Sequence, residues 1–256
     1  MKNQQFQTST IAEALLWPSL LIIVLWLFYW AEHLFLFPFH ELGVQPGTSK
    51  GLVGIVGMPL IHAQNDIRHI VNNSIPVFIL SATLIHFYKP IALRVFLILW
   101  ITTGLLVWAF AATNGHYHIG ISGVIYGLAS FLFTSGVLRK FLPLQAISLF
   151  VVFMYGSMIW GLFPMQERIS WEGHLAGFLA GIVLAFVYRK EGTQRPKFQY
   201  EIEKEMGIEP PDLEGIYHEQ LRQEEELQRW KERMANGHVI VYHYVPDSTK
   251  EDGKNQ

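Results

Sequence analysis

Cysteine is absent from the 256-residue chain, and charged residues are scarce along most of it. The lack of cysteine excludes disulfide bonds and thiolate metal sites, although it leaves the cellular compartment open. Residues 1–188 carry only 14 of the 40 Asp, Glu, Lys and Arg residues, and residues 189–256 carry the other 26. The net charge of −2 gives no support for a nucleic-acid partner. The first three quarters of the chain therefore suit a low-dielectric solvent, and the last quarter suits water.

Six mostly apolar stretches follow one another within residues 11–189, and turn-forming residues separate them. A helix needs about 20 such residues to cross the hydrocarbon of a bilayer. The sixth stretch reaches this length only if it begins near Trp171. We therefore predict an all-α membrane protein built as a bundle of six transmembrane helices. The predicted spans are Leu15–Phe37, Ile70–Tyr88, Ile91–Ala112, Ile121–Leu138, Leu142–Phe163 and Leu175–Tyr188.

Lysine and arginine are distributed unevenly between the two ends of this bundle. Up to Lys190, seven lie at the end that carries the N-terminus and three at the opposite end. Cytoplasmic loops are the ones enriched in these residues, and the first apolar run lacks the cleavage signature of a removable signal peptide. We predict a multi-pass protein of the plasma membrane (the inner membrane in bacteria) with both termini cytoplasmic. Residues 1–10 form a short cytoplasmic segment, 11–189 the membrane domain and 190–256 a small soluble tail.

Polar residues gather where the second, fourth and sixth spans begin, which is the outer side in this orientation. The second span opens with His69 and Asn73, the fourth with Gly120-Ile121-Ser122-Gly123, and the sixth with Gly173-His174. Each lies within about a turn of the start of its helix, so at 1.5 Å rise per residue all have similar depth. Polar groups inside a bilayer are costly and usually face a cavity or a partner. The topology therefore brings a hydroxyl, an imidazole and an amide to one level.

These groups are the ones that nucleophilic acyl transfer requires. A serine hydroxyl becomes a nucleophile beside a base, and neutral imidazole is such a base near pH 7. The oxyanion that forms needs hydrogen-bond donors, which the Asn73 amide and the free N–H groups at the start of the fourth span supply. Gly177 and Gly181 form a Gly-x-x-x-Gly pair below His174, which lets two helices approach closely. The sequence thus predicts Ser122 as nucleophile and His174 as its base.

Each of these signals has a purely structural interpretation when taken alone. A Gly-x-Ser-Gly segment, a histidine near a membrane interface or a Gly-x-x-x-Gly pair most often serves helix packing. Their combination at one depth is what favours an enzyme. His62, His116 and His118 lack the spacing of a metal site, so no metal or cofactor is expected. A transporter is a further class, and it is disfavoured because the sequence contains no convincing internal repeat.

Three segments, in this order along residues 50–188, resemble the rhomboid family. They are the histidine-containing stretch at 62–73 that ends in His69-Ile70-Val71-Asn72-Asn73, the nucleophile segment Ser122-Gly123-Val124-Ile125-Tyr126-Gly127, and the base segment Gly173-His174-Leu175-Ala176-Gly177. The resemblance implies a rhomboid-like bundle of six helices and a Ser–His dyad without a third carboxylate. It implies an intramembrane serine endopeptidase whose substrates are transmembrane proteins within the lipid bilayer, cut near the outer face. A non-catalytic rhomboid-like protein that binds or escorts membrane helices is the alternative.

The resemblance also implies roles for single residues. His69, Asn73 and the Ser122 N–H would hold the oxyanion beside Gly120, and Tyr126 would stack on His174. The loop after the first span departs from the family pattern, since it has Phe37-Pro38-Phe39-His40-Glu41 where a Trp-Arg pair is common. Trp160 and Phe163, near the end of the fifth span, are candidate gate residues.

The tail has a different pattern from the rest of the chain. Apolar residues between Leu213 and Met234 recur irregularly at helical spacing, and Glu225 and Arg229 form an i,i+4 pair. Asn236-Gly237 is expected to end this helix. His238–Val245 is rich in β-branched and aromatic residues and is predicted to form a strand. The sequence does not indicate a partner for the tail.

Overall fold

The computed structural model describes residues 10–35, 37–154, 157–165, 170–192, 197–208, 211–237 and Tyr242. These residues form helices joined by short loops, with an isolated β-bridge between Val44 and His118. The α-helices in chain order are α1 (Ile11–Phe35), α2 (Gly51–Gly57), α3 (Ile67–Tyr88), α4 (Ala92–Phe110), α5 (Ser122–Leu138), α6 (Leu142–Met154), α7 (Ser157–Trp160), α8 (Trp171–Val187), α9 (Gln199–Glu205) and α10 (Leu213–Ala235). Two 3₁₀-helices, η1 (Phe39–Leu42) and η2 (Met58–Leu60), flank α2.

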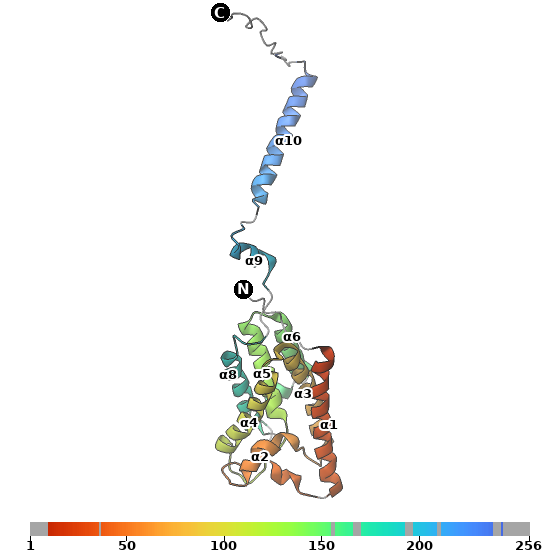
Figure 1. The fold of residues 1–256 in the computed structure, drawn as a ribbon, viewed down its shortest axis with the longest axis vertical. Helices are drawn as coiled ribbons and strands as arrows, with labels where there is room; N and C mark the ends of the chain where they lie inside the picture. Colours follow the sequence, from red (N-terminus) through yellow and green to blue (C-terminus); the bar gives the residue numbers. More distant parts are fainter. Residues whose placement is uncertain are drawn as a thin grey trace, which may run out of the picture. The chain divides into compact units, whose positions relative to one another are not determined.

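The chain divides into two compact units, residues 1–196 and residues 197–256. In the first unit, Figure 1 shows α1, α3, α4, α5, α6 and α8 side by side as a bundle, with α2 lying across one end. The second unit contains α9 and α10. The chemistry predicted from the sequence falls entirely on the first unit.

The helix α5 lies at the centre of the bundle. It contacts α3, α4, α6 and α8 and buries twelve of its seventeen residues. By contrast, α1 buries only five of its 25 residues and exposes large apolar side chains such as Trp17 and Leu27. A helix that exposes apolar side chains in this way suits a lipid environment. The groups at the start of α5 are consequently enclosed by protein on several sides.

Helix lengths support membrane insertion for part of the bundle. Among the described residues, α1, α3 and α4 are long and apolar enough to cross a membrane, whereas α5 and α8 are apolar but only 17 residues long. The sixth predicted stretch does begin at Trp171. Within the predicted fifth span, Leu142–Phe163, the structure describes α6 up to Met154 and α7 up to Trp160, and positions 155 and 156 lie outside the described residues. Six full-length spans are therefore a proposal, and three are shown by length and composition.

The helix predicted in the tail is confirmed as α10. The Asp212 side chain accepts a hydrogen bond from the Gly215 N–H at 2.8 Å and so caps the first turn. Glu225 and Arg229 lie 3.6 Å apart, and Gly237 follows the helix with φ = 68°, as a helix-terminating glycine does. The strand predicted at His238–Val245 lies outside the described residues, apart from Tyr242.

Candidate active site

Ser122 and His174 meet where α5 and α8 pack together. Ser122 is the first residue of α5, and His174 lies in the first turn of α8. The Ser122 Oγ lies 2.8 Å from the His174 Nε2, a hydrogen-bond distance. Although 52 residues separate them in sequence, the two residues that the sequence selected as nucleophile and base are in direct contact.

The hydrogen bond of the second ring nitrogen of His174 determines which nitrogen of the neutral ring carries the proton. The His174 Nδ1 lies 2.9 Å from the carbonyl oxygen of Gly161. A carbonyl oxygen can only accept a hydrogen bond, so in the neutral imidazole the proton lies on Nδ1. The Nε2 lone pair then faces the Ser122 hydroxyl. This tautomer is the one in which the imidazole can take the serine proton.

Tyr126 holds the imidazole ring from one face. The rings of Tyr126 and His174 are stacked, with centroids 4.3 Å apart and an interplanar angle of 15°. Both residues are buried. Tyr126 lies one helical turn after Ser122 on α5, so the nucleophile and the ring that packs on the base belong to the same helix face. The stacking predicted from the family resemblance is present.

Glycines make the close approach of α5 and α8 possible. A Cβ at Gly177 would collide with the carbonyl oxygen of Gly123, and one at Gly181 would collide with the carbonyl oxygen of Gly127. The helix backbones therefore touch directly over two turns below the dyad. Contact at this distance is what a short hydrogen bond between side chains of two helices requires.

His69 and Asn73, both on α3, converge on Gly120, two residues before the nucleophile. A Cβ at Gly120 would lie 2.8 Å from the His69 Nε2 and 3.7 Å from the Asn73 Nδ2. Gly120 has φ = 105°, a conformation that L side chains rarely adopt. The Asn73 Nδ2 is buried and has no hydrogen-bond partner within the part of the chain that the structure describes. An amide donor is thus available beside Gly120, two residues before the serine.

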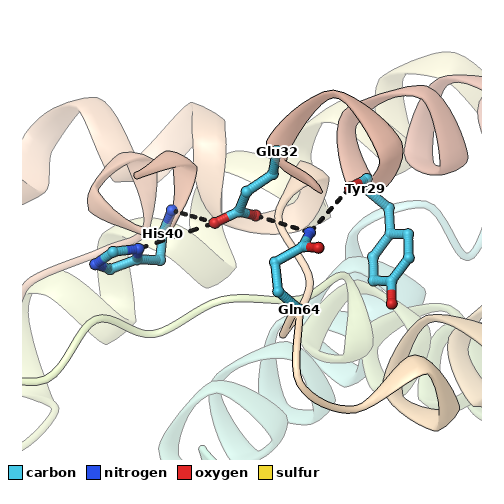
Figure 2. A network of polar contacts seen from close by, with 4 residues as sticks. All are labelled: Tyr29, Glu32, His40 and Gln64. Atoms are coloured by element: carbon cyan, nitrogen blue, oxygen red, sulfur yellow. Dashed lines mark hydrogen bonds and ion pairs between the residues drawn. The ribbon is translucent and has the colours of Figure 1, made fainter. Parts of the chain in front are cut away.

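The loop that leads into α3 is held by a polar network at the C-terminal end of α1 (Figure 2). The Gln64 Nε2 donates to the Tyr29 carbonyl oxygen at 2.9 Å and to the Glu32 Oε2 at 3.2 Å. The Glu32 Oε1 accepts from the His40 N–H at 3.3 Å. The buried carboxylate therefore links α1 to η1 and to the segment that precedes His69. Sequence reasoning gave these residues no role in the site.

His62 lies in the same loop and faces His69, with ring centroids 5.1 Å apart. It is almost fully buried, and neither ring nitrogen has a partner among the described residues. Burial, together with the neighbouring His69, lowers the pKa of His62 from 6.5 to about 3. The ring is therefore neutral near pH 7 and adds no positive charge beside His69.

Two candidate gate residues predicted from the sequence remain. Trp160 and Phe163 are exposed and flank Gly161, and their gating role stays a prediction. The structure describes no group of His, Asp and Glu side chains able to hold a metal ion. Sequence reasoning missed Gly161 and Ser170. Ser170 had a signal, since a serine just before an apolar helix is a typical N-cap, whereas the Gly161 carbonyl had none.

Known proteins with similar sequences include a family model and several mycobacterial proteins. A sequence model of the Rhomboid domain matches residues 49–191. The chain is 34% identical over 158 residues to an uncharacterized protein of Mycobacterium tuberculosis and, equally, to one of Mycobacterium bovis. These alignments cover 57% of this chain and 62% of each relative, so they span less than two thirds of the relatives' length. An uncharacterized protein of Mycobacterium leprae is 29% identical over 178 residues, which are 67% of this chain and 68% of that protein.

Proposed function

Because the chain belongs to the rhomboid family, we propose that it is an intramembrane serine endopeptidase that cleaves transmembrane segments near their outer end. The observation that carries the proposal is the 2.8 Å contact between the Ser122 Oγ and the His174 Nε2. It joins a hydroxyl to an imidazole whose other nitrogen already donates to a carbonyl. No carboxylate is needed to orient this base, because the Gly161 carbonyl takes that part.

The proposed reaction proceeds in two steps. The Ser122 Oγ attacks the scissile carbonyl while the His174 Nε2 accepts its proton, and the same nitrogen then returns the proton to the leaving amine. Water hydrolyses the acyl-enzyme in the second step, with His174 acting again as base. The stacking of Tyr126 on His174 keeps the ring aligned through both steps.

Donors for the oxyanion come from two directions. The Asn73 Nδ2, which is buried and has no hydrogen-bond partner among the residues that the structure describes, flanks Gly120 together with the ring of His69. The first turn of α5 has no side-chain cap, since its N-cap residue is Ile121. Uncapped N–H groups at a helix N-terminus favour a developing negative charge. A tetrahedral intermediate on Ser122 would therefore form beside several donors.

The proposed substrate is a membrane-spanning helix, and the proposed arrangement is six spans with both termini cytoplasmic. The dyad lies at the start of α5 and α8, the end of the bundle that this arrangement assigns to the outer face. A helix hides its amides in hydrogen bonds, so residues that weaken a helix near that face are expected at the cleavage site. A non-catalytic, helix-binding role is not favoured, because nucleophile, base and donors are all present.

The test is labelling of the detergent-purified protein with a fluorophosphonate probe, which reacts with activated serines and needs no known substrate. We expect the wild type to be labelled and Ser122→Ala and His174→Ala to be unlabelled. Ser135→Ala is the matched control, because this buried serine lies on the same helix, about 20 Å farther along its axis. It should label like the wild type. A well-folded wild type that fails to label would contradict the proposal.

A further inference from the structure

His118 is a buried histidine that the proposed reaction does not use. It is 9% exposed and precedes Ser122 by four residues. Its Nδ1 lies 2.6 Å from the Oγ of Ser170, which belongs to the segment before α8. The loop of the nucleophile and the helix of the base are therefore joined by a second short bond, apart from the dyad itself.

The backbone of His118 is fixed independently of this bond. Its N–H donates to the Val44 carbonyl oxygen at 2.8 Å, and its carbonyl oxygen accepts from the Val44 N–H at 2.9 Å. Val44 is completely buried, and a Cβ at the preceding Gly43 would lie only 2.6 Å from the His118 carbonyl oxygen. The paired backbone leaves the ring of His118 little freedom to move away from Ser170.

Ser170 in turn controls the first turn of α8. It is the N-cap residue, whose Oγ accepts from the Gly173 N–H at 3.4 Å and whose carbonyl oxygen accepts from the His174 N–H at 3.2 Å. A serine hydroxyl has one proton and two lone pairs, so it can bond His118 and the Gly173 N–H together. A displacement of Ser170 would therefore be passed directly to the backbone of His174.

We propose that His118 is a positioning residue for the base: through Ser170 it sets the start of α8 and thereby the Ser122–His174 distance. This inference rests on the proposed function for its effect on reactivity. The proposed acyl transfer does not require this role, because the hydrogen bonds of His118 within the described part of the chain go to Ser170 and Val44 and to neither half of the dyad. A shift of about 1 Å in a catalytic group can cost about a hundredfold in rate.

The experiment compares His118→Leu with His118→Asn, because an asparagine amide can occupy the place of Nδ1 and bond Ser170 whereas leucine cannot. Fluorophosphonate labelling gives the maximal rate of inactivation and the probe concentration at half-maximal rate. We expect His118→Leu to lower the maximal rate of inactivation about ten- to a hundredfold, with little change in the probe concentration at half-maximal rate. His118→Asn should recover most of the maximal rate. Combined with Ser170→Ala, His118→Leu should cause little further loss, because both act through one bond.

His116→Leu is the matched control, since this exposed histidine lies two residues away, and it should label normally. If His118→Leu labels like the wild type, or if asparagine fails to restore the rate, the inference is wrong.

The ¹⁵N NMR spectrum of the His174 ring gives a readout that does not depend on catalysis. Its signal is assigned by its loss in His174→Gln. That signal should move in His118→Leu and return in His118→Asn even if the wild type does not label. An unmoved signal would overturn the positioning role, and an unlabelled wild type would contradict the proposed function alone.

Discussion

Gly161 contributes no side chain, yet its carbonyl oxygen decides which nitrogen of His174 faces Ser122. The position also has no room for a larger residue, because a Cβ there would lie 2.9 Å from the His174 Nδ1 and would collide with the Tyr126 hydroxyl. At the scale of single residues, the geometry of the site therefore depends on backbone groups and on glycines without a side chain as much as on reactive side chains. The same holds for Gly120 beside His69.

His62 makes the fold sensitive to acid. Its pKa is lowered by burial from 6.5 to about 3, so the unfolded chain binds a proton at this ring before the folded one does. Its contribution to stability is complete above pH 6.5 and is lost as the pH falls toward 3. Between pH 7.5 and pH 5 we expect a loss of about 2 kcal/mol in the free energy of unfolding from this residue.

The measurement is the unfolding of wild type and His62→Gln in detergent at both pH values. Because glutamine does not titrate, the stability difference between the two proteins should shift by about 2 kcal/mol in favour of the variant at pH 5. The comparison cancels the effect of histidines that do not interact with His62. Parallel pH profiles for the two proteins would show that the His62 ring does not stay neutral in the folded state.

The sequence alone pointed to the site residues whose side-chain type indicates a chemical role. It did not reveal the residues whose role depends on where the fold places them. A serine and a histidine at the N-terminal ends of two apolar stretches are polar groups in a costly place, and they are in contact. The role of Gly161 could not be foreseen, because any residue has a carbonyl and only the turn after α7 aims this one. The role of His118 could not be foreseen either. Its contact with Ser170 joins residues 52 positions apart, which no sequence pattern reveals.

At the scale of the helices, hydropathy located the elements closely and their ends less well. The predicted spans at Ile91–Ala112 and Ile121–Leu138 match α4 and α5 to within two residues. The span predicted at Ile70–Tyr88 begins three residues earlier, at Ile67, because the first turn of α3 contains the polar residues Arg68 and His69. Apolar composition records which solvent a segment suits and carries little information on where its backbone turns.

The contact between α5 and α8 is the element on which the dyad depends. In Gly177→Ala the new methyl group would collide with the Gly123 carbonyl oxygen, and a helix backbone cannot yield as a flexible side chain can. We expect the helices to separate near the site, with about 1–3 kcal/mol of lost stability and at least a tenfold slower probe labelling. Thermal unfolding and the labelling rate, measured on the same preparation, check both effects.

Two further variants separate packing from catalysis. Leu179→Ala is the control on the same helix, because Leu179 is half exposed, and it should affect neither quantity strongly. Gly181→Ala collides in the same way one turn farther from His174, so it should lower stability with a smaller effect on labelling. Equal loss of labelling at both glycines would mean that the interface acts as one rigid unit.

At the scale of the whole molecule, the distribution of charge agrees with the division into two units. The apolar part of the chain, up to residue 188, falls within the first unit, and the charged α10, which buries no residue, belongs to the second. A helix without a buried face gains little from tertiary packing, so α10 depends on its Asp212 cap and on pairs such as Glu225–Arg229. The tail therefore suits water and the bundle suits lipid.

The proposed orientation can be tested directly because the chain contains no cysteine. Asn114, in the loop between α4 and α5, and Glu224, on α10, are both exposed, so a single cysteine at either position leaves the packed core untouched. In intact bacterial cells we expect a membrane-impermeant maleimide to label Asn114→Cys, and to label Glu224→Cys only after the cells are permeabilised. Since the Lys and Arg asymmetry assigns both termini to the cytoplasm, labelling of Glu224→Cys in intact cells would reverse the orientation. The dyad would then open to the cytoplasmic face, and the proposed substrates would be cut at their cytoplasmic ends.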